Sequence, residues 1–132
     1  MKLILDTQMI IWATFWSEKL PAQARQLIVD LDNDIFFSPV SLWETAIKNS
    51  RNRPDFKVEA RILRRRLLDC GYQEIPITGL HTVAVSDLPL LHKDPFDRLL
   101  LAQAKIEGFT LLTTDATLSA YPAPVLLVRK SG

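Results

Sequence analysis

Four acidic residues stand at positions where their carboxylates could do chemistry: Asp6, Glu44, Asp97 and Asp115. Asp6 and Asp115 each end a short apolar run, LILD and LLTTD, and such runs predict buried strands. In an open parallel sheet, functional groups gather beyond the carboxyl ends of the strands. Either aspartate could instead serve only as the N-cap of the next helix, and for a single such residue capping is the commoner role.

Glu44 lies inside the apolar stripe of an expected helix, four residues after Val40 and three before Ile47. Burying an ionised carboxylate is costly unless it meets a cation, a metal ion or a proton. Lys48 follows one turn later and offers the simpler alternative of a surface ion pair between residues i and i+4.

The segment KDPFDR places two aspartates three residues apart at the start of another expected helix. Asp94 precedes Pro95, and an N-cap acid followed by proline is a strong signal for a helix start. Asp97 could close a capping box at the third helical position. Because it also lies three residues before Leu100 and four before Leu101, it falls at the end of the buried stripe. We therefore expect Asp94 to cap the helix and Asp97 to point inward.

If the four carboxylates converge at one edge of the sheet, their charges repel one another unless cations lie among them. Cys70 is the only cysteine, and His81 and His92 are far apart, so the metal ligands expected here are oxygens. Oxygen ligands favour Mg²⁺, with Mn²⁺ as the other candidate. Such ions activate water and stabilise the leaving oxygen of a phosphodiester, which indicates nuclease chemistry.

The elements that must position these acids follow from the hydrophobic pattern. Strands are expected at 2–6, 34–39, 72–77, 109–115 and 123–128, with 72–77 at an edge because of Pro76. Helices are expected at 7–16, within 17–33 (starting near Pro21 and ending near Asp32), at 39–50 (with Val40, Trp43 and Ile47 on one side), at 57–70, within 79–91, and at 95–107. This alternation predicts an α/β fold, a three-layer α/β/α sandwich with a central, mostly parallel sheet.

The 132 residues, 48% of them hydrophobic and 23% charged, fit one soluble globular domain over 1–132. No apolar run approaches the roughly 20 residues that cross a membrane, and no signal peptide is evident, so we expect a cytoplasmic protein. The net charge is +1, but residues 48–66 hold eight basic and two acidic side chains, a balance of +6. That segment could face a polyanion or could equally be a solvated helix surface.

The motifs LILDT, SPVSLWETAIK, HKDPFDRLLLAQA and LLTTDATLSAY resemble, in order and spacing, those of PIN-domain ribonucleases of the VapC toxin type. The resemblance covers essentially the whole chain. It implies that Asp6, Glu44, Asp97 and Asp115 form a catalytic, metal-binding site, in which Asp6 and Asp97 are the direct ligands. It also implies hydroxyl residues beside the site at Thr7 and Thr113. Many relatives have histidine where this chain has Gln8, which leaves the four acids intact.

The same resemblance implies cleavage of RNA, often tRNA, by Mg²⁺- or Mn²⁺-activated water, with arrest of translation. It further implies a homodimer and silencing by a VapB-like antitoxin, for which residues 7–31 are the candidate surface. Trp12, Phe15 and Trp16 supply apolar bulk there, although Trp12 could equally pack in the core. His92 and Arg98 flank the acids and could touch a phosphate; the simpler expectation leaves His92 in solvent and lets Arg98 neutralise the acids.

Other functions use the same residues. A metal-dependent DNA nuclease or a phosphatase could use the same carboxylates, and a non-catalytic module could hold Mg²⁺ and RNA without cutting it. Formation of cleaved product separates the last possibility from the enzymes, because a binding module loses RNA as salt rises but releases no fragments. A phosphoacceptor signalling domain fits poorly, since the late basic residues Arg129 and Lys130 lie at the extreme end of the chain.

Overall fold

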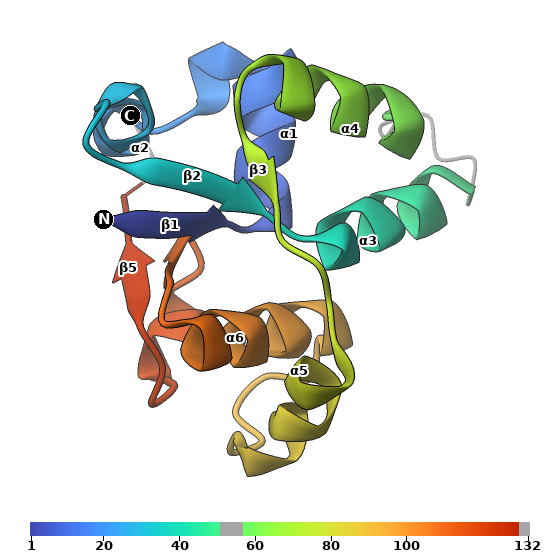
Figure 1. Cartoon of the computed structure of the whole chain (residues 1–132), viewed down its shortest axis with the longest axis vertical. Helices are drawn as coiled ribbons and strands as arrows, with labels where there is room; N and C mark the ends of the chain where they lie inside the picture. The colour runs from blue at the N-terminus through green and yellow to red at the C-terminus, as the bar shows by residue number, and fades with distance from the viewer. Residues whose placement is uncertain (51–56, 130–132) are drawn as a thin grey trace.

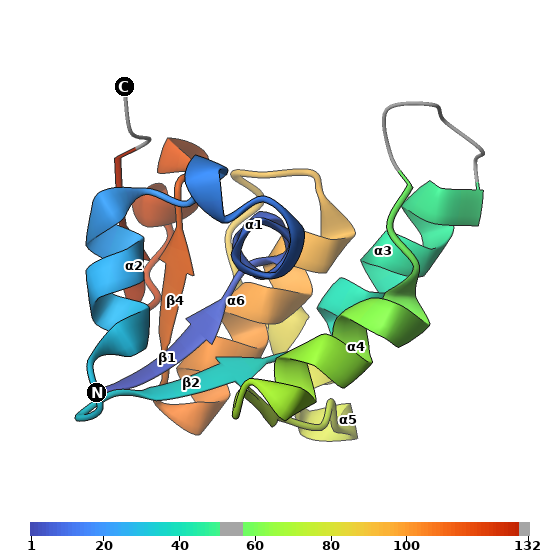
Figure 2. The same ribbon diagram turned by 90° about the horizontal axis from the view of Figure 1, so that it is seen from above.

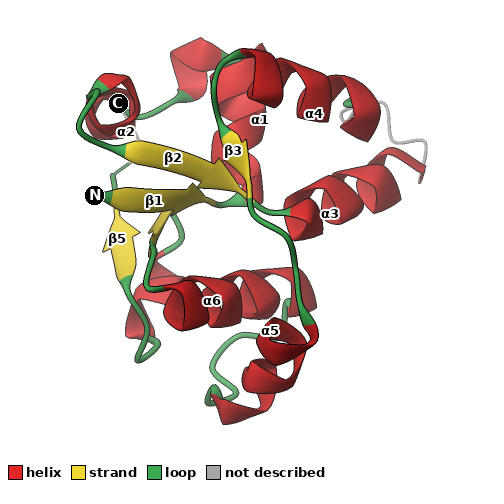
Figure 3. Cartoon of the chain, viewed as in Figure 1, coloured by secondary structure: helices red, strands yellow, loops and turns green. Residues whose placement is uncertain are grey.

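The computed structural model describes residues 1–50 and 57–129, so part of the basic segment 48–66, and Lys130, lie outside it. Within this part, five strands form a parallel sheet in the order β3-β2-β1-β4-β5 (Figure 3). The short strand β3 is at an edge, as predicted. The strands are β1 (Lys2–Leu5), β2 (Asp34–Phe37), β3 (Gln73–Glu74), β4 (Thr110–Thr113) and β5 (Val125–Leu127).

Helices cover both faces of the sheet, which confirms the three-layer sandwich (Figure 1). One face carries α1 (Thr7–Phe15), α2 (Ala22–Val29) and α4 (Ala60–Asp69), and the other carries α5 (Gly79–Ala84) and α6 (Pro95–Glu107). Helix α3 (Pro39–Ser50) leaves the end of β2 and lies beside α4 (Figure 2). Short 3₁₀ turns are η1 (Ser17–Lys19), η2 (Val85–Asp87) and η3 (Ala116–Ala120).

The helix predicted within 17–33 starts near Pro21, as expected, but its predicted end near Asp32 is wrong. A 3₁₀ turn occupies residues 17–19, and α2 starts at Ala22, directly after the N-cap residue Pro21. Proline lacks the N–H that would continue a helix from the preceding turn, and its fixed φ suits a helix start. Helix α2 then ends at Val29, because Asp30 has an extended backbone and its carboxylate accepts from the Asp32 N–H at 2.9 Å.

Alternate residues of the strands feed two hydrophobic cores, one on each face of the sheet. Leu3 and Leu5 pack under α1, α2 and α4, whereas Ile4 packs against α6. The same alternation separates Leu112 from Leu111 in the neighbouring strand. Burial on both faces explains why these strands read as continuous apolar runs. Among the described residues, no helix is long and apolar enough to cross a membrane.

From β1, the chain adds β2 and β3 on one side of the sheet, and later adds β4 and β5 on the other side. The direction in which strands are added therefore reverses between β1 and β4. In open α/β sheets, ligands bind beyond the carboxyl ends of the strands at such a reversal. The Asp6 N–H donates to the Leu112 carbonyl at 3.2 Å and joins the two strand ends there. The fold thus places both acids that end a strand, Asp6 and Asp115, at this point.

The expected inner face of α3 is wrong for Trp43. Val40 is buried as predicted, but Trp43 is 59% exposed. Glu44 lies on the inner face as predicted, together with Ser41. The Thr7 hydroxyl at the start of α1 donates to Glu44 Oε1 at 2.6 Å, and its oxygen is 2.9 Å from Ser41 Oγ. With these polar contacts on the inner face, Trp43 lies on another side of the helix, where its indole packs against the Phe96 ring and is largely exposed.

Candidate functional site

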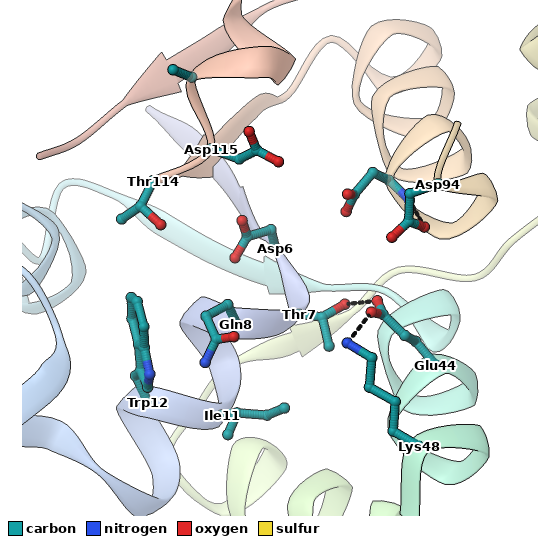
Figure 4. Close-up of a pocket in the computed structure, with 12 residues that line it drawn as sticks. Asp6, Thr7, Gln8, Ile11, Trp12, Glu44, Lys48, Asp94, Thr114 and Asp115 are labelled. Carbon is teal, nitrogen blue, oxygen red and sulfur yellow. Dashed lines mark hydrogen bonds and ion pairs between the residues drawn. The ribbon is translucent and has the colours of Figure 1, made fainter. Parts of the chain in front are cut away.

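All four predicted site residues line one cavity of about 420 Å³ beyond the carboxyl ends of β1 and β4 (Figure 4). They come from β1–α1, α3, α6 and the loop after β4, which are distant in sequence. The full lining consists of Asp6, Thr7, Gln8, Ile11, Trp12, Glu44, Lys48, Asp94, Asp97, Thr114, Asp115 and Ala116. The cavity therefore holds five carboxylates and one lysine.

Asp6 both caps a helix and faces the cavity, so the two interpretations of this residue are compatible. Its Oδ1 accepts from the Met9 N–H at 2.9 Å, and its Oδ2 accepts from the Thr113 hydroxyl at 2.5 Å. Burial raises the pKa of Asp6 to about 6, although these two hydrogen bonds lower it. The charges of Glu44 and Asp115 raise the pKa further, because each disfavours a second ionised carboxyl nearby.

Glu44 forms the predicted pair with Lys48, with 2.7 Å between Oε2 and Nζ. The pair differs from the expected surface pair, because Glu44 is only 5% exposed. Its other oxygen accepts from the Thr7 hydroxyl, as the dashed lines in Figure 4 show. The carboxylate is thereby fixed between α1 and α3 with its charge compensated by one lysine.

Asp94 and Asp97 divide their roles as predicted. Asp94 Oδ1 accepts from the Phe96 N–H at 2.8 Å and from the Asp97 N–H at 3.3 Å, which caps α6. The Asp97 carboxylate does not close a capping box, because the Asp94 N–H donates to His92 Nδ1 at 3.4 Å. Burial, followed by the charges of Asp94, Glu44 and Asp6, raises the pKa of Asp97 to about 7.

Asp115 caps the short turn η3 and also faces the cavity. Its Oδ1 accepts from the Thr117 N–H at 2.9 Å, while its own N–H donates to the Thr113 hydroxyl at 3.0 Å. Thr113 therefore touches both acids that follow strands, since its O–H donates to Asp6. Gln8 also lines the cavity, next to Asp6 and Thr7 (Figure 4).

The expectation that His92 lies in solvent is wrong. Its Nε2 is 3.2 Å from Asp97 Oδ2 and 3.4 Å from Asp115 Oδ2. Its Nδ1, on the other side of the ring, accepts from the Asp94 N–H at 3.4 Å, so Nε2 is the ring nitrogen that faces the acids. One ligand atom from each of His92, Asp97 and Asp115 lies within 4.8 Å of the others. The structure thus adds a nitrogen donor to the expected oxygen donors.

Of the two roles considered for Arg98, neutralising the acids is not the one its side chain has in the described part of the chain. Its guanidinium donates to the carbonyl oxygens of Pro89, Val85 and Leu88, and to the Tyr121 hydroxyl at 3.2 Å. These contacts satisfy the planar fork of an arginine with oxygens from one loop. Arg98 therefore fixes the segment that leads into His92, and it does so away from the cavity.

Tyr121 completes this support and was missed in the sequence. Its hydroxyl accepts from the His92 N–H at 2.6 Å and from the Leu91 N–H at 3.2 Å. The residue lies 29 positions after His92, in an irregular segment with no periodic pattern, so no local signal links the two. Only the fold brings this tyrosine beneath the loop.

The donor set of the cavity fits a divalent cation. Two of its carboxyl groups, Asp6 and Asp97, have a raised pKa because they are buried beside other negative charges. A metal ion held by them would favour their ionised forms and relieve this repulsion. Carboxylate oxygens suit Mg²⁺ and Mn²⁺, while an imidazole in reach also suits softer divalent metals.

The sequence profile of the PIN domain matches residues 3–124, and the chain belongs to the PIN-domain family. PIN domains are nucleases, which hydrolyse phosphodiester bonds, and they use divalent metal ions. No curated protein matches the chain in sequence.

Solved structures share the fold. VapBC2 from Rickettsia felis, bound to a promoter DNA fragment, matches with a TM-score of 0.70 and 18% identity, over 99% of this chain and 100% of that chain. A toxin-antitoxin complex from Klebsiella pneumoniae matches with a TM-score of 0.63 and 16% identity, over 94% and 95%. DNA-bound VapBC from Salmonella typhimurium matches with a TM-score of 0.63 and 14% identity, over 96% and 97%. At these identities the likeness concerns the fold.

Proposed function

We propose that the protein is a Mg²⁺- or Mn²⁺-dependent endoribonuclease that acts as the toxin of a VapBC-type toxin-antitoxin pair. The observation that carries the proposal is the convergence of Asp6, Glu44, Asp97 and Asp115, from four separate elements, on one cavity. Structured RNA such as tRNA is the proposed substrate, and its cleavage would inhibit translation.

Asp6 and Asp97 would hold the metal ion, and Glu44 and Asp115 would complete the site. The ion would supply activation of water and stabilisation of the charge that develops on the leaving oxygen. The residues around the acids keep them in place for this task. The Thr113 hydroxyl orients Asp6, Lys48 and Thr7 orient Glu44, and His92 lies between Asp97 and Asp115.

The basic segment supports a polyanionic substrate only in part. Arg64 is paired with Glu74 at 2.7 Å, and the Arg66 guanidinium lies over the Phe15 ring, 5.0 Å from its centroid. Arg61 and Arg65, on the outer side of α4, are exposed. These two cations are available to phosphates, whereas the charge of Arg64 is compensated by Glu74 and Arg66 packs against an aromatic ring.

An antitoxin segment is proposed to bind along residues 7–31. Trp12, Phe15 and Trp16 are half-buried there and pack against the core beneath α1. Because Trp12 also lines the acidic cavity, a segment bound along α1 would lie at its mouth. For the proposed homodimer, the apolar side chains on and after α5 offer an exposed surface, namely Leu80, Val83, Leu90 and Leu91.

The test is incubation of end-labelled total tRNA, and of a single-stranded DNA of similar length, with Mg²⁺, Mn²⁺ or EDTA. We expect RNA fragments with either metal and none with EDTA or with the folded variant Asp97→Asn. Preferential cutting of DNA would favour the DNA nuclease, and hydrolysis of p-nitrophenyl phosphate without RNA cutting would favour the phosphatase. Bound but intact RNA would identify a non-catalytic module.

A further inference from the structure

A second cavity of about 340 Å³ adjoins the acidic one, between α3 and the start of α6. The two cavities share three lining residues, Glu44, Lys48 and Asp94, which Figure 4 shows on one side of the acidic cavity. The remaining lining residues are Ile47, Lys93, Pro95 and Phe96. A substrate strand that leaves the acidic cavity on this side enters the second one directly.

An aromatic pair lies at this second cavity, because Phe96 lines it and Trp43, which is not itself a lining residue, packs against Phe96. Trp43 packs its ring against that of Phe96 in a T-shaped arrangement, with centroids 5.0 Å apart and planes at 76°. Phe96 is half-buried against the core under α6, whereas Trp43 is 59% exposed. A large, rigid aromatic residue turned out of the core is typical of a surface that binds another ring or an apolar group.

The charges around the cavity favour an anionic ligand at its rim. Lys93 is exposed, and in the described part of the chain it has no ion pair or hydrogen bond. Lys48, in contrast, is held by Glu44. Because the neighbouring cavity is lined by carboxylates, a polyanion needs a cation beside them to lie close. Lys93 has the charge and the reach to contact a phosphate.

We propose that this second cavity binds one unpaired nucleotide of the RNA substrate next to the bond that is cut. Its base stacks on the exposed indole of Trp43 at the edge of the cavity, beside Phe96, and its phosphate lies near Lys93. An unpaired nucleotide is required because a base inside a duplex is already stacked on its neighbours. The volume lies within the range of about 300–1,000 Å³ usual for small-ligand sites. This inference rests on the proposed ribonuclease function and adds the local form of its substrate.

The first experiment measures RNA binding in EDTA, by fluorescence anisotropy of a labelled single-stranded RNA and of the same RNA in a duplex. Trp43→Ala should weaken single-strand binding about tenfold, which is within the usual contribution of one stacked base. Trp43→Phe keeps an aromatic ring and should stay within about threefold of wild type. Leu31→Ala, at a fully exposed apolar residue before β2, is the matched control and should bind like wild type.

The second experiment measures cleavage of the single-stranded RNA with Mg²⁺. Trp43→Ala should raise KM by about tenfold with kcat retained, because the stacked base contributes equally to the bound substrate and to the transition state. Lys93→Gln should lower the slope of log Kd against log salt by about 0.7, as expected for the loss of one phosphate contact to a single strand.

Three outcomes would overturn the subsite. Trp43→Ala could bind and cut single-stranded RNA like wild type, or the duplex could bind as tightly as the single strand. Trp43→Ala could also change the oligomeric state, measured by light scattering, while Trp43→Phe does not, which would show that a second copy covers the indole. A wild-type protein that cuts no RNA would instead refute the proposed function itself, and the subsite with it.

Discussion

The chain gathers acidic residues in two places that differ in almost every physical respect. At the amino-terminal edge of the sheet, three aspartates fall within five residues before and at the start of β2: Asp30, Asp32 and Asp34. All three are exposed, and the Asp30 carboxylate accepts from the Asp32 N–H as in an ordinary turn. Water solvates these charges, so their proximity has little consequence.

At the carboxyl-terminal edge, the acids are spread from position 6 to position 115 but line one cavity. Burial and mutual repulsion raise the pKa of Asp6 and of Asp97 there. The comparison teaches that the density of acids in a sequence does not define a metal site. A metal site is defined by acids that converge where water reaches poorly, because a cation must compensate their charge only in such a place.

The largest difference is expected between variants that neutralise an acid of the buried group and a variant that neutralises an acid of the exposed group. Asp6→Asn and Asp97→Asn keep the shape of the side chain but remove a charged ligand, so RNA cleavage with Mg²⁺ should fall about 10³-fold. Asp34→Asn should retain wild-type rates. Initial rates on end-labelled RNA measure both, with circular dichroism to show that each variant is folded. Equal losses in both groups would abolish the distinction drawn above.

The second effect concerns stability without metal. The pKa of Asp97 is about 7 in the folded protein against an ordinary 3.8. Between these pH values the carboxyl group is therefore ionised in the unfolded chain but protonated in the folded protein. The free energy of unfolding therefore falls as pH rises through this window and levels off above about 7. Asp97→Asn removes this penalty and should be more stable than wild type by about 2 kcal/mol at pH 7.5, with no gain near pH 4.

Urea denaturation in EDTA at both pH values measures this difference. Asp34→Asn is the control and should change the free energy of unfolding by less than about 0.5 kcal/mol at either pH, because it lies on the surface. A variant Asp97→Asn that is less stable than wild type at pH 7.5 would show that its carboxylate is not under repulsion in the folded protein.

The third effect tests the hydroxyl group that donates to a buried acid, a contact that the exposed acids lack in the described part of the chain. Thr113→Val removes the O–H that donates to Asp6 at 2.5 Å. Since this hydrogen bond favours the ionised carboxylate, its loss should raise the pKa of Asp6 further above about 6. Cleavage at pH 6 should then fall about tenfold, and less at pH 8, where Asp6 still ionises. A pH–rate profile identical to that of wild type would contradict this role of Thr113.

The smallest effect tests support from outside the cavity. Tyr121→Phe removes the hydroxyl that accepts from the His92 and Leu91 N–H groups. Leaving these donors without their acceptor should lower the free energy of unfolding by about 1–2 kcal/mol. Cleavage should fall only about threefold, because the four acids keep their own contacts. Denaturant titration and rate measurements check the two parts separately, and a loss of cleavage as large as that of Asp97→Asn would make the tyrosine part of the reacting centre.

Sequence reasoning predicted the features that local chemistry determines. Helix α6 has the expected bounds, because Asp94 and Pro95 begin it and Gly108, with φ of 74°, ends it. The strands that end at Asp6 and Asp115 follow from their apolar runs. The same reasoning predicted that the four acids meet at one edge of the sheet, because the carboxyl ends of parallel strands share that edge.

What the sequence could not predict depends on contacts between distant residues. Trp43 is exposed in a helix whose inner face is fixed by the contacts of the Thr7 hydroxyl with Ser41 and Glu44, 34 and 37 residues away. The place of His92 follows from Tyr121, 29 residues further along the chain. Helical periodicity carries no information about either, since tertiary hydrogen bonds decide which side of an amphipathic segment faces inward.

The central claim is that the acids of the carboxyl-terminal edge, and not those of the amino-terminal edge, hold a divalent cation. Titration with Mn²⁺, followed by the electron paramagnetic resonance signal of the free ion, tests this claim without requiring a substrate. We expect wild type and Asp34→Asn to bind Mn²⁺ with equal affinity and Asp97→Asn to leave the ion free. Asp94→Asn should bind Mn²⁺ with an affinity within about threefold of wild type, because asparagine still caps α6. Binding by Asp97→Asn that equals that of wild type, or loss of binding in Asp34→Asn, would contradict the account.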